Sequence, residues 1–72
     1  MATTVDARGF SCPQPVLMTL EAIKKGSPQD LIVLVDTDTS RENVMRAAQS
    51  QGYTVQDVTP EGEGYRIHIV KG

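Results

Sequence analysis

The sequence predicts an α+β fold, a two-layer α/β sandwich with elements in the order β-α-β-α-β-β and both helices on one face of a four-stranded mixed sheet. Strand-like segments alternate twice with segments of helical periodicity, and the chain ends in two strand-like segments around a Pro- and Gly-containing turn. A chain of 72 residues buries only about 60 % of its unfolded surface. We therefore expect a single domain over residues 1–72, with one core and no deep substrate cavity.

The first strand and helix are predicted before residue 30. Thr3–Ala7 is a short β-branched stretch that favours a strand, and Gly9 interrupts it. A helix follows, with a buried face predicted from three-to-four spacing at Val16, Leu17, Leu20 and Ile23. Two lysines, Lys24 and Lys25, occupy its last turn, where cations complement the helix dipole, and residues 26–28 (Gly-Ser-Pro) end it.

The second strand, Leu31–Val35, is apolar at every position, which predicts an inner strand covered on both faces. The crossover from the first strand fits a right-handed parallel βαβ unit. Residues 36–38 form the turn beyond it. The spacing of Thr39 and Glu42 suggests a capping box that starts a second helix near Ser40.

The second helix has a narrow apolar face consisting of Val44, Ala47 and Ala48. Gly52, after Gln51, is a good left-handed terminator. Tyr53–Thr59 and Tyr65–Val70 then bracket residues 60–64 and predict an antiparallel hairpin. Alternation in the last strand predicts one buried face, made by Tyr65, Ile67 and Ile69, and one largely wet face, made by Arg66, His68 and Val70.

Composition excludes several classes of protein. Hydrophobic residues make up 39 % of the chain and charged residues 22 %, as in an ordinary soluble domain. The longest apolar run, Leu31–Val35, is far shorter than the roughly 20 residues of a membrane span, and residues 1–4 lack the features of a signal peptide. The net charge is −2 with scattered basic residues, so we expect no direct contact with nucleic acid.

The cysteine count points to a reducing compartment. One cysteine cannot close an internal disulfide, so we expect a cytoplasmic protein. One cysteine and one histidine also fall short of the ligands of a structural zinc ion, and we expect no metal and no cofactor.

The stretch Cys12-Pro13-Gln14-Pro15 carries the chemistry. Prolines are tolerated in the first turn of a helix, where they fix the backbone and leave Gln14 and Val16 among the few N–H donors. Cys12 at or just before the N-cap would have its thiol pKa lowered from about 8.5 toward neutrality by the helix dipole. The residue before a proline avoids helical geometry, however, so the helix can instead begin at Pro15, with Cys12 farther from the dipole.

The pattern Asp6-x-Arg8-Gly9-x-x-Cys12-Pro13-x-Pro15 resembles the defining motif of the TusA/SirA-like sulfur-carrier family. The likeness extends over essentially the whole chain, through Val35-Asp36, Glu42-Asn43-Val44, Gln51-Gly52-Tyr53 and Gly64-Tyr65. The segment 36–39 differs from the Asp-Asp-Pro run of the tRNA-thiolation branch. The pattern is closest to the N-terminal domain of YedF-type proteins, which are linked to selenium metabolism.

The resemblance implies that Cys12 holds sulfur as a persulfide, received from a cysteine desulfurase or rhodanese-type donor and passed to an acceptor protein. It implies a monomeric carrier of the sulfurtransferase type rather than an autonomous enzyme. Pro13 and Pro15 would shape the loop, with Asp6, Arg8 and Gly9 holding it. The alternatives are a selenium-linked carrier, a sulfurtransferase acting on small molecules, and an interaction domain in which the cysteine is inert.

Other polar residues have simpler interpretations. Arg8 is a solvated charge, a support for the anionic sulfur or a partner of Asp6. His68 is expected to be an exposed strand residue. Turn and capping roles are preferred over a cation site for Asp36, Asp38 and Glu42, and Arg41 and Arg46 form either a solvated face or a docking contact.

Overall fold

The computed structural model describes residues 3–11, 13–26 and 28–72. Six elements follow one another in the predicted order. They are β1 (Thr3–Asp6), α1 (Gln14–Gly26), β2 (Asp30–Val35), α2 (Asp38–Ser50), β3 (Tyr53–Glu61) and β4 (Gly64–Lys71).

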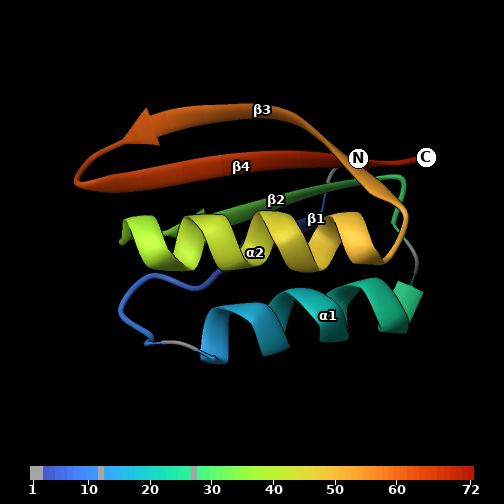
Figure 1. Cartoon of the computed structure of the whole chain (residues 1–72), viewed down its shortest axis with the longest axis horizontal. Coiled ribbons are helices and arrows are strands. Elements are labelled where there is room, and N and C mark those ends of the chain that lie inside the picture. Colours follow the sequence, from blue (N-terminus) through green and yellow to red (C-terminus); the bar gives the residue numbers. More distant parts are fainter. Residues whose placement is uncertain (1–2, 12, 27) are drawn as a thin grey trace.

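The four strands form one mixed sheet in the order β1-β2-β4-β3. β1 pairs with β2 in parallel, and β4 pairs antiparallel with both β2 and β3. Both helices cover the same side of the sheet, and both begin at the end where β1 and β2 finish (Figure 1). The predicted fold class is confirmed. Among the described residues, no helix is both long enough and apolar enough to cross a membrane.

The core lies between the helices and the sheet. Its buried members come from every element except β1, joined by Ala7 just after that strand. The buried hydrophobic residues are Ala7, Ile23, Leu31, Val33, Val35, Val44, Ala48, Tyr53, Ile67 and Ile69. Met18 and Met45 pack against this cluster from its margin, as partly buried side chains.

The predicted buried face of α1 is partly wrong. The helix buries Pro15, Thr19 and Ile23, whereas Leu17 is 53 % exposed. At 3.6 residues per turn, Leu17 lies about 200° around the helix axis from Pro15, on the opposite side. Thr19 tolerates full burial because its hydroxyl donates to the Pro15 carbonyl at 2.9 Å.

β2 is an inner strand, as predicted, but it is not covered on both faces. Its side chains alternate between full burial at Leu31, Val33 and Val35 and partial burial at Ile32 and Leu34. Both helices lie on one side of the sheet, so the second row of β2 faces the uncovered side.

α2 begins earlier than predicted. Its N-cap is Thr37, whose hydroxyl accepts from the Ser40 N–H at 3.1 Å, so the predicted capping box between Thr39 and Glu42 is wrong. Thr37 has extended backbone angles directly after β2, which is the geometry that an N-cap requires. Thr39 is already inside the helix and cannot serve as its cap.

The hairpin and the end of α2 follow the prediction with a shorter turn. Pro60 pairs with Tyr65 and Glu61 with Gly64, so the loop contains two residues rather than five. Proline is tolerated in β3 because this strand lies at the edge of the sheet. Gly52 has a φ of 86°, the left-handed conformation predicted beyond α2.

Candidate functional site

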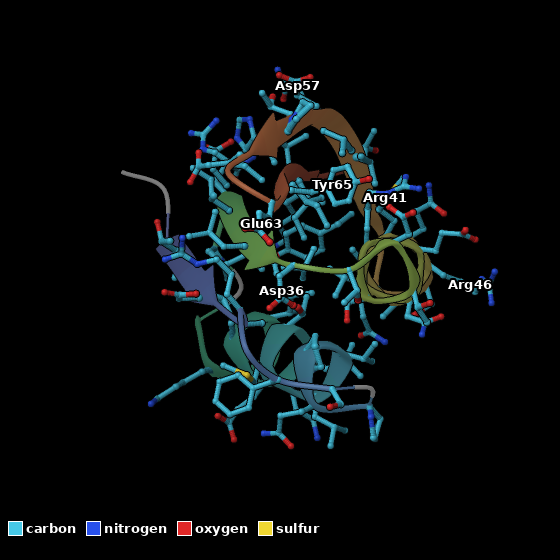
Figure 2. All side chains as sticks on the ribbon, turned by 90° about the vertical axis from the view of Figure 1, so that its left-hand side faces the viewer. Asp36, Arg41, Arg46, Asp57, Glu63 and Tyr65 are labelled. Carbon is cyan, nitrogen blue, oxygen red and sulfur yellow. The ribbon has the colours of Figure 1, made fainter. Side chains whose placement is uncertain are left out.

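The candidate site lies at the end of the molecule where β1 and β2 finish and both helices begin; Figure 2 looks onto this end. Cys12, predicted at or just before the N-cap of α1, is outside the described residues. Its chain neighbours Ser11 and Pro13 are described. The candidate site is therefore described through the loop 7–11, the first turn of α1 and the residues that contact them.

The first turn of α1 brackets position 12. The Gln14 N–H donates to the Ser11 carbonyl at 2.8 Å, and the Leu17 N–H donates to the Pro13 carbonyl at 3.0 Å. The helix thus begins at Gln14, two residues after Cys12, and not at Pro15. The Gln14 N–H, predicted to be one of the few donors at the start of the helix, already donates to the Ser11 carbonyl. The first turn contains no acidic side chain.

Arg8 pairs with Asp6, which decides among its three interpretations. The guanidinium donates to both carboxylate oxygens, at 2.9 and 2.8 Å, and the Arg8 N–H donates to the same carboxylate at 3.2 Å. These hydrogen bonds lower the pKa of Asp6 to about 2 and raise that of Arg8. Both side chains are about half exposed, so the pair shapes the loop but adds little stability.

Asp36 holds the loop from the second strand. Its carboxylate accepts from the Gly9 N–H at 2.8 Å, across 27 residues of sequence. Gly9 has a φ of 84°, a conformation that favours glycine, and it makes this contact through its backbone. The sequence indicated only turn chemistry for Asp36. The available signal was the parallel pairing of β1 and β2, which brings the residues after both strands to one edge (Figure 2).

Gly64 packs directly against the backbone beside Asp36. A Cβ atom at Gly64 would lie 2.0 Å from the Val35 carbonyl oxygen and 2.7 Å from the Asp36 Cα. Any side chain there would have to displace the end of β2. The start of β4 therefore fixes the backbone from which the Asp36 side chain reaches the loop.

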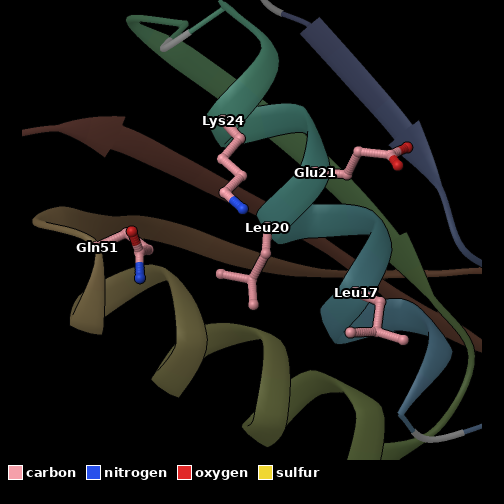
Figure 3. A pocket seen from close by; sticks show the side chains of 5 residues that line it. All are labelled: Leu17, Leu20, Glu21, Lys24 and Gln51. Atoms are coloured by element: carbon pink, nitrogen blue, oxygen red, sulfur yellow. The ribbon is translucent and has the colours of Figure 1, made fainter.

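Two large apolar side chains near Cys12 in sequence are exposed to solvent. Phe10 is 47 % exposed and Leu17 is 53 % exposed. A hollow is lined by residues 9–11 of the loop and, around the start of α2, by Asp36, Thr37, Thr39 and Ser40. A second hollow runs from Leu17 along α1 to Lys24 and reaches Gln51 beyond the end of α2 (Figure 3). Phe10 lines the first of these hollows and Leu17 lines the second.

Close partners from other elements of the fold are observed for His68, Asp38 and Arg41. His68 is half-buried rather than exposed, because it lies on β4 within 3.2 Å of the Asp30 carboxylate. The Tyr65 hydroxyl donates to the Asp38 carboxylate, and the Arg41 guanidinium lies 5.0 Å from the centre of the Tyr65 ring. Figure 2 shows Tyr65 and Arg41 close together. Within ranges 3–11, 13–26 and 28–72, no three metal-binding side chains gather.

The family model described as sulfurtransferase TusA matches residues 3–71. The chain belongs to the TusA family. This finding confirms the resemblance carried by the motif around Cys12, and members of this family include proteins named as sulfur carriers.

Individual relatives agree with the family. YedF of Escherichia coli (strain K12), named as a candidate sulfur carrier, is 39 % identical over 70 residues, covering 93 % of this chain and 88 % of that protein. A similarly named protein of Methanocaldococcus jannaschii is 35 % identical over 68 residues, covering 93 % and 91 %. The crystal structure of a SirA-like protein from Desulfitobacterium hafniense has a TM-score of 0.83 at 32 % identity, covering 100 % of this chain and 99 % of that one.

Proposed function

We propose that this TusA-family protein is a sulfur carrier that holds a persulfide on Cys12. The observation that best supports the proposal is the start of α1, two residues after Cys12, with no acidic side chain in its first turn. The positive end of the helix dipole there favours a thiolate or persulfide anion. Pro13 and Pro15 would stiffen the approach to the helix, while Asp6, Arg8 and Gly9 would hold the loop.

The transfer needs one nucleophile. The Cys12 thiolate attacks the terminal sulfur of a persulfide on the donor protein. The sulfur–sulfur bond in the donor breaks, the donor cysteine leaves as a thiolate, and Cys12 becomes a persulfide. Passing the sulfur to an acceptor cysteine repeats the same exchange, so no metal or oxidant is required.

The partners in this proposal are proteins: a cysteine desulfurase or rhodanese-type donor and a downstream acceptor, met in the cytoplasm. Phe10 and Leu17 offer exposed apolar contacts near Cys12. A small contact area suits a carrier that must release each partner quickly. The carrier itself would act as a monomer, without direct binding to nucleic acid or membrane.

Intact mass spectrometry tests the proposal. The protein is incubated with a cysteine desulfurase, cysteine and pyridoxal phosphate. We expect a gain of one sulfur atom that dithiothreitol removes and that is absent from the Cys12→Ala variant. A wild-type protein that gains no sulfur, or a Cys12→Ala variant that still gains it, would contradict a carrier role for Cys12.

A further inference from the structure

We propose that Asp36 is a positioning residue for Cys12, which acts by holding the Gly9 backbone and so fixing the loop that presents the sulfur. The inference rests on the proposed function for its role in transfer. The hydrogen bond itself does not depend on that function. No sulfur chemistry is assigned to Asp36.

Besides the Asp6–Arg8 pair and the hydrogen bond from the Phe10 N–H to the Ala7 carbonyl, three hydrogen bonds hold the loop between β1 and α1. The Ala7 N–H donates to the Leu34 carbonyl at 2.8 Å, which continues the parallel pairing beyond β1. The Gly9 N–H donates to Asp36 at 2.8 Å, and the Gln14 N–H closes the turn onto Ser11. Of these three contacts, the one between Gly9 and Asp36 uses a side chain. It is therefore the contact that a substitution can remove while the backbone hydrogen bonds remain.

Asp36 reaches the loop from a rigid base. It follows Val35, which is fully buried, and the Gly64 backbone packs against both residues so closely that no Cβ fits between them. Asp36 is itself exposed, so replacing its side chain removes no core packing. The Asp36 side chain thus links the end of the sheet to residues 8–11 of the loop, which are all exposed.

Holding the loop should speed sulfur transfer. Exchange between two sulfur atoms needs a defined approach, and a loop kept in one conformation loses less entropy when the partner docks. The Asp36 carboxylate also carries a negative charge, and any electrostatic influence of a negative charge on a thiolate is unfavourable. The two effects have opposite signs, so substitutions can separate them.

The first experiment compares Asp36→Ala, which removes the acceptor, with Asp36→Asn, which keeps an oxygen acceptor and removes the charge. Asp38→Ala is the matched control, since it removes a carboxylate from the same end of the molecule that contacts Tyr65 and not the loop. Three readouts are hydrogen exchange at the Gly9 amide, the rate of Cys12 alkylation by iodoacetamide against pH, and the rate of persulfide loading by a cysteine desulfurase.

We expect Asp36→Ala to lose protection at the Gly9 amide and to load persulfide about tenfold more slowly, the size of one charge-assisted hydrogen bond. Asp36→Asn should retain most of the protection and load within about threefold of the wild-type rate, with faster alkylation at neutral pH because the charge is gone. Asp38→Ala should match the wild type at the Gly9 amide and in loading.

A second altered form of the chain tests the same hydrogen bond without changing any side chain, so side-chain effects on folding do not enter. Chemical synthesis of the 72-residue chain with an ester in place of the Gly9 amide removes the donor and leaves Asp36 intact. We expect the same loss of loading as in Asp36→Ala.

Wild-type loading in a folded Asp36→Ala or ester protein would overturn the positioning role, as would equal losses in Asp36→Ala and Asp36→Asn. If the wild-type chain itself accepts no sulfur, the proposed function fails. The hold on the loop is then judged by exchange at Gly9 and by alkylation of Cys12.

Discussion

The two helices begin side by side at the same end of the molecule, yet their first turns are built differently (Figure 1). Each has 13 residues. α2 starts with a Thr37 cap on the Ser40 N–H and carries Asp38 in its first turn. α1 has no acidic residue in its first turn, and its two lysines lie in the last turn, where α2 has no basic residue.

We interpret the start of α2 as purely structural and the start of α1 as suited to holding an anion. The positive end of the α2 dipole is balanced by the Asp38 carboxylate, and the Ser40 N–H is satisfied by the Thr37 side chain. The start of α1 is fixed by proline instead, and no carboxylate in its first turn opposes a nearby anion. Of the two helix starts, that of α1 is therefore the better suited to an anion, as the proposed function requires.

The largest effect that sharpens the comparison should come from the packing of each helix. Val44 of α2 is fully buried, whereas Leu17 of α1 is 53 % exposed. We expect Val44→Ala to lower the free energy of unfolding by about 2 kcal/mol through lost burial and a residual cavity. Leu17→Ala should change it by less than about 0.5 kcal/mol. Urea denaturation of both variants gives the comparison, and similar losses would show that Leu17 packs in the core.

The cap of α2 is the next largest effect. Thr37→Ala removes the acceptor for the Ser40 N–H and should destabilise the protein by about 1 kcal/mol. Thr37→Ser keeps the acceptor and serves as the control. Because Thr37 belongs to the structural helix start, we expect the alkylation rate of Cys12 in the folded Thr37→Ala protein to stay at the wild-type value. A large change in that rate would mean that the two helix starts are coupled.

The order of elements was predictable because strong local signals agree along the chain. The apolar run of β2, the glycine at position 52 and the alternation in β4 each reflect a nearby physical constraint. The exposed position of Leu17 was not predictable in this way. A helix with apolar residues on more than half of its surface has no unique buried face, and the sheet selected the one that contains Thr19.

The candidate site was predictable in its residue types but not in its contacts. The motif identified Asp6, Arg8 and Gly9, and their loop geometry agrees with a holding role. Asp36 was missed because its partner lies 27 residues away, and no local pattern encodes such a contact. The N-cap at Thr37 was missed because Thr39 and Glu42 have the spacing of a capping box two residues later in the chain. In the structure α2 has already begun at Asp38, so Thr39 cannot be its N-cap.

A charge placed at the start of α1 should break the contrast between the helices. Gln14→Glu gives α1 the first-turn acid that α2 has, which should stabilise the helix by about 0.3–1 kcal/mol. The same charge should raise the thiol pKa of Cys12 and slow its alkylation near neutral pH by about threefold. Gln29→Glu, at an exposed position beyond the other end of α1, is the matched control. An unchanged rate in Gln14→Glu, at low salt where screening is weak, would count against the dipole argument.

The smallest expected effect concerns Asp38, whose carboxylate is balanced by the α2 dipole and also accepts from Tyr65. The hydrogen bond to Asp38 raises the pKa of Tyr65 above its usual value of 10.0. A raised tyrosine pKa means that the folded state holds its proton more tightly. The contribution to stability is therefore complete below about pH 10 and is lost as the pH rises through the raised pKa. Ultraviolet titration in a Tyr53→Phe background, which leaves one tyrosine, isolates Tyr65. We expect Asp38→Ala to lower the titration midpoint, and Asp38→Asn to lower it less because its amide oxygen still accepts. An unchanged midpoint in Asp38→Ala would mean that Asp38 serves the dipole of α2 alone.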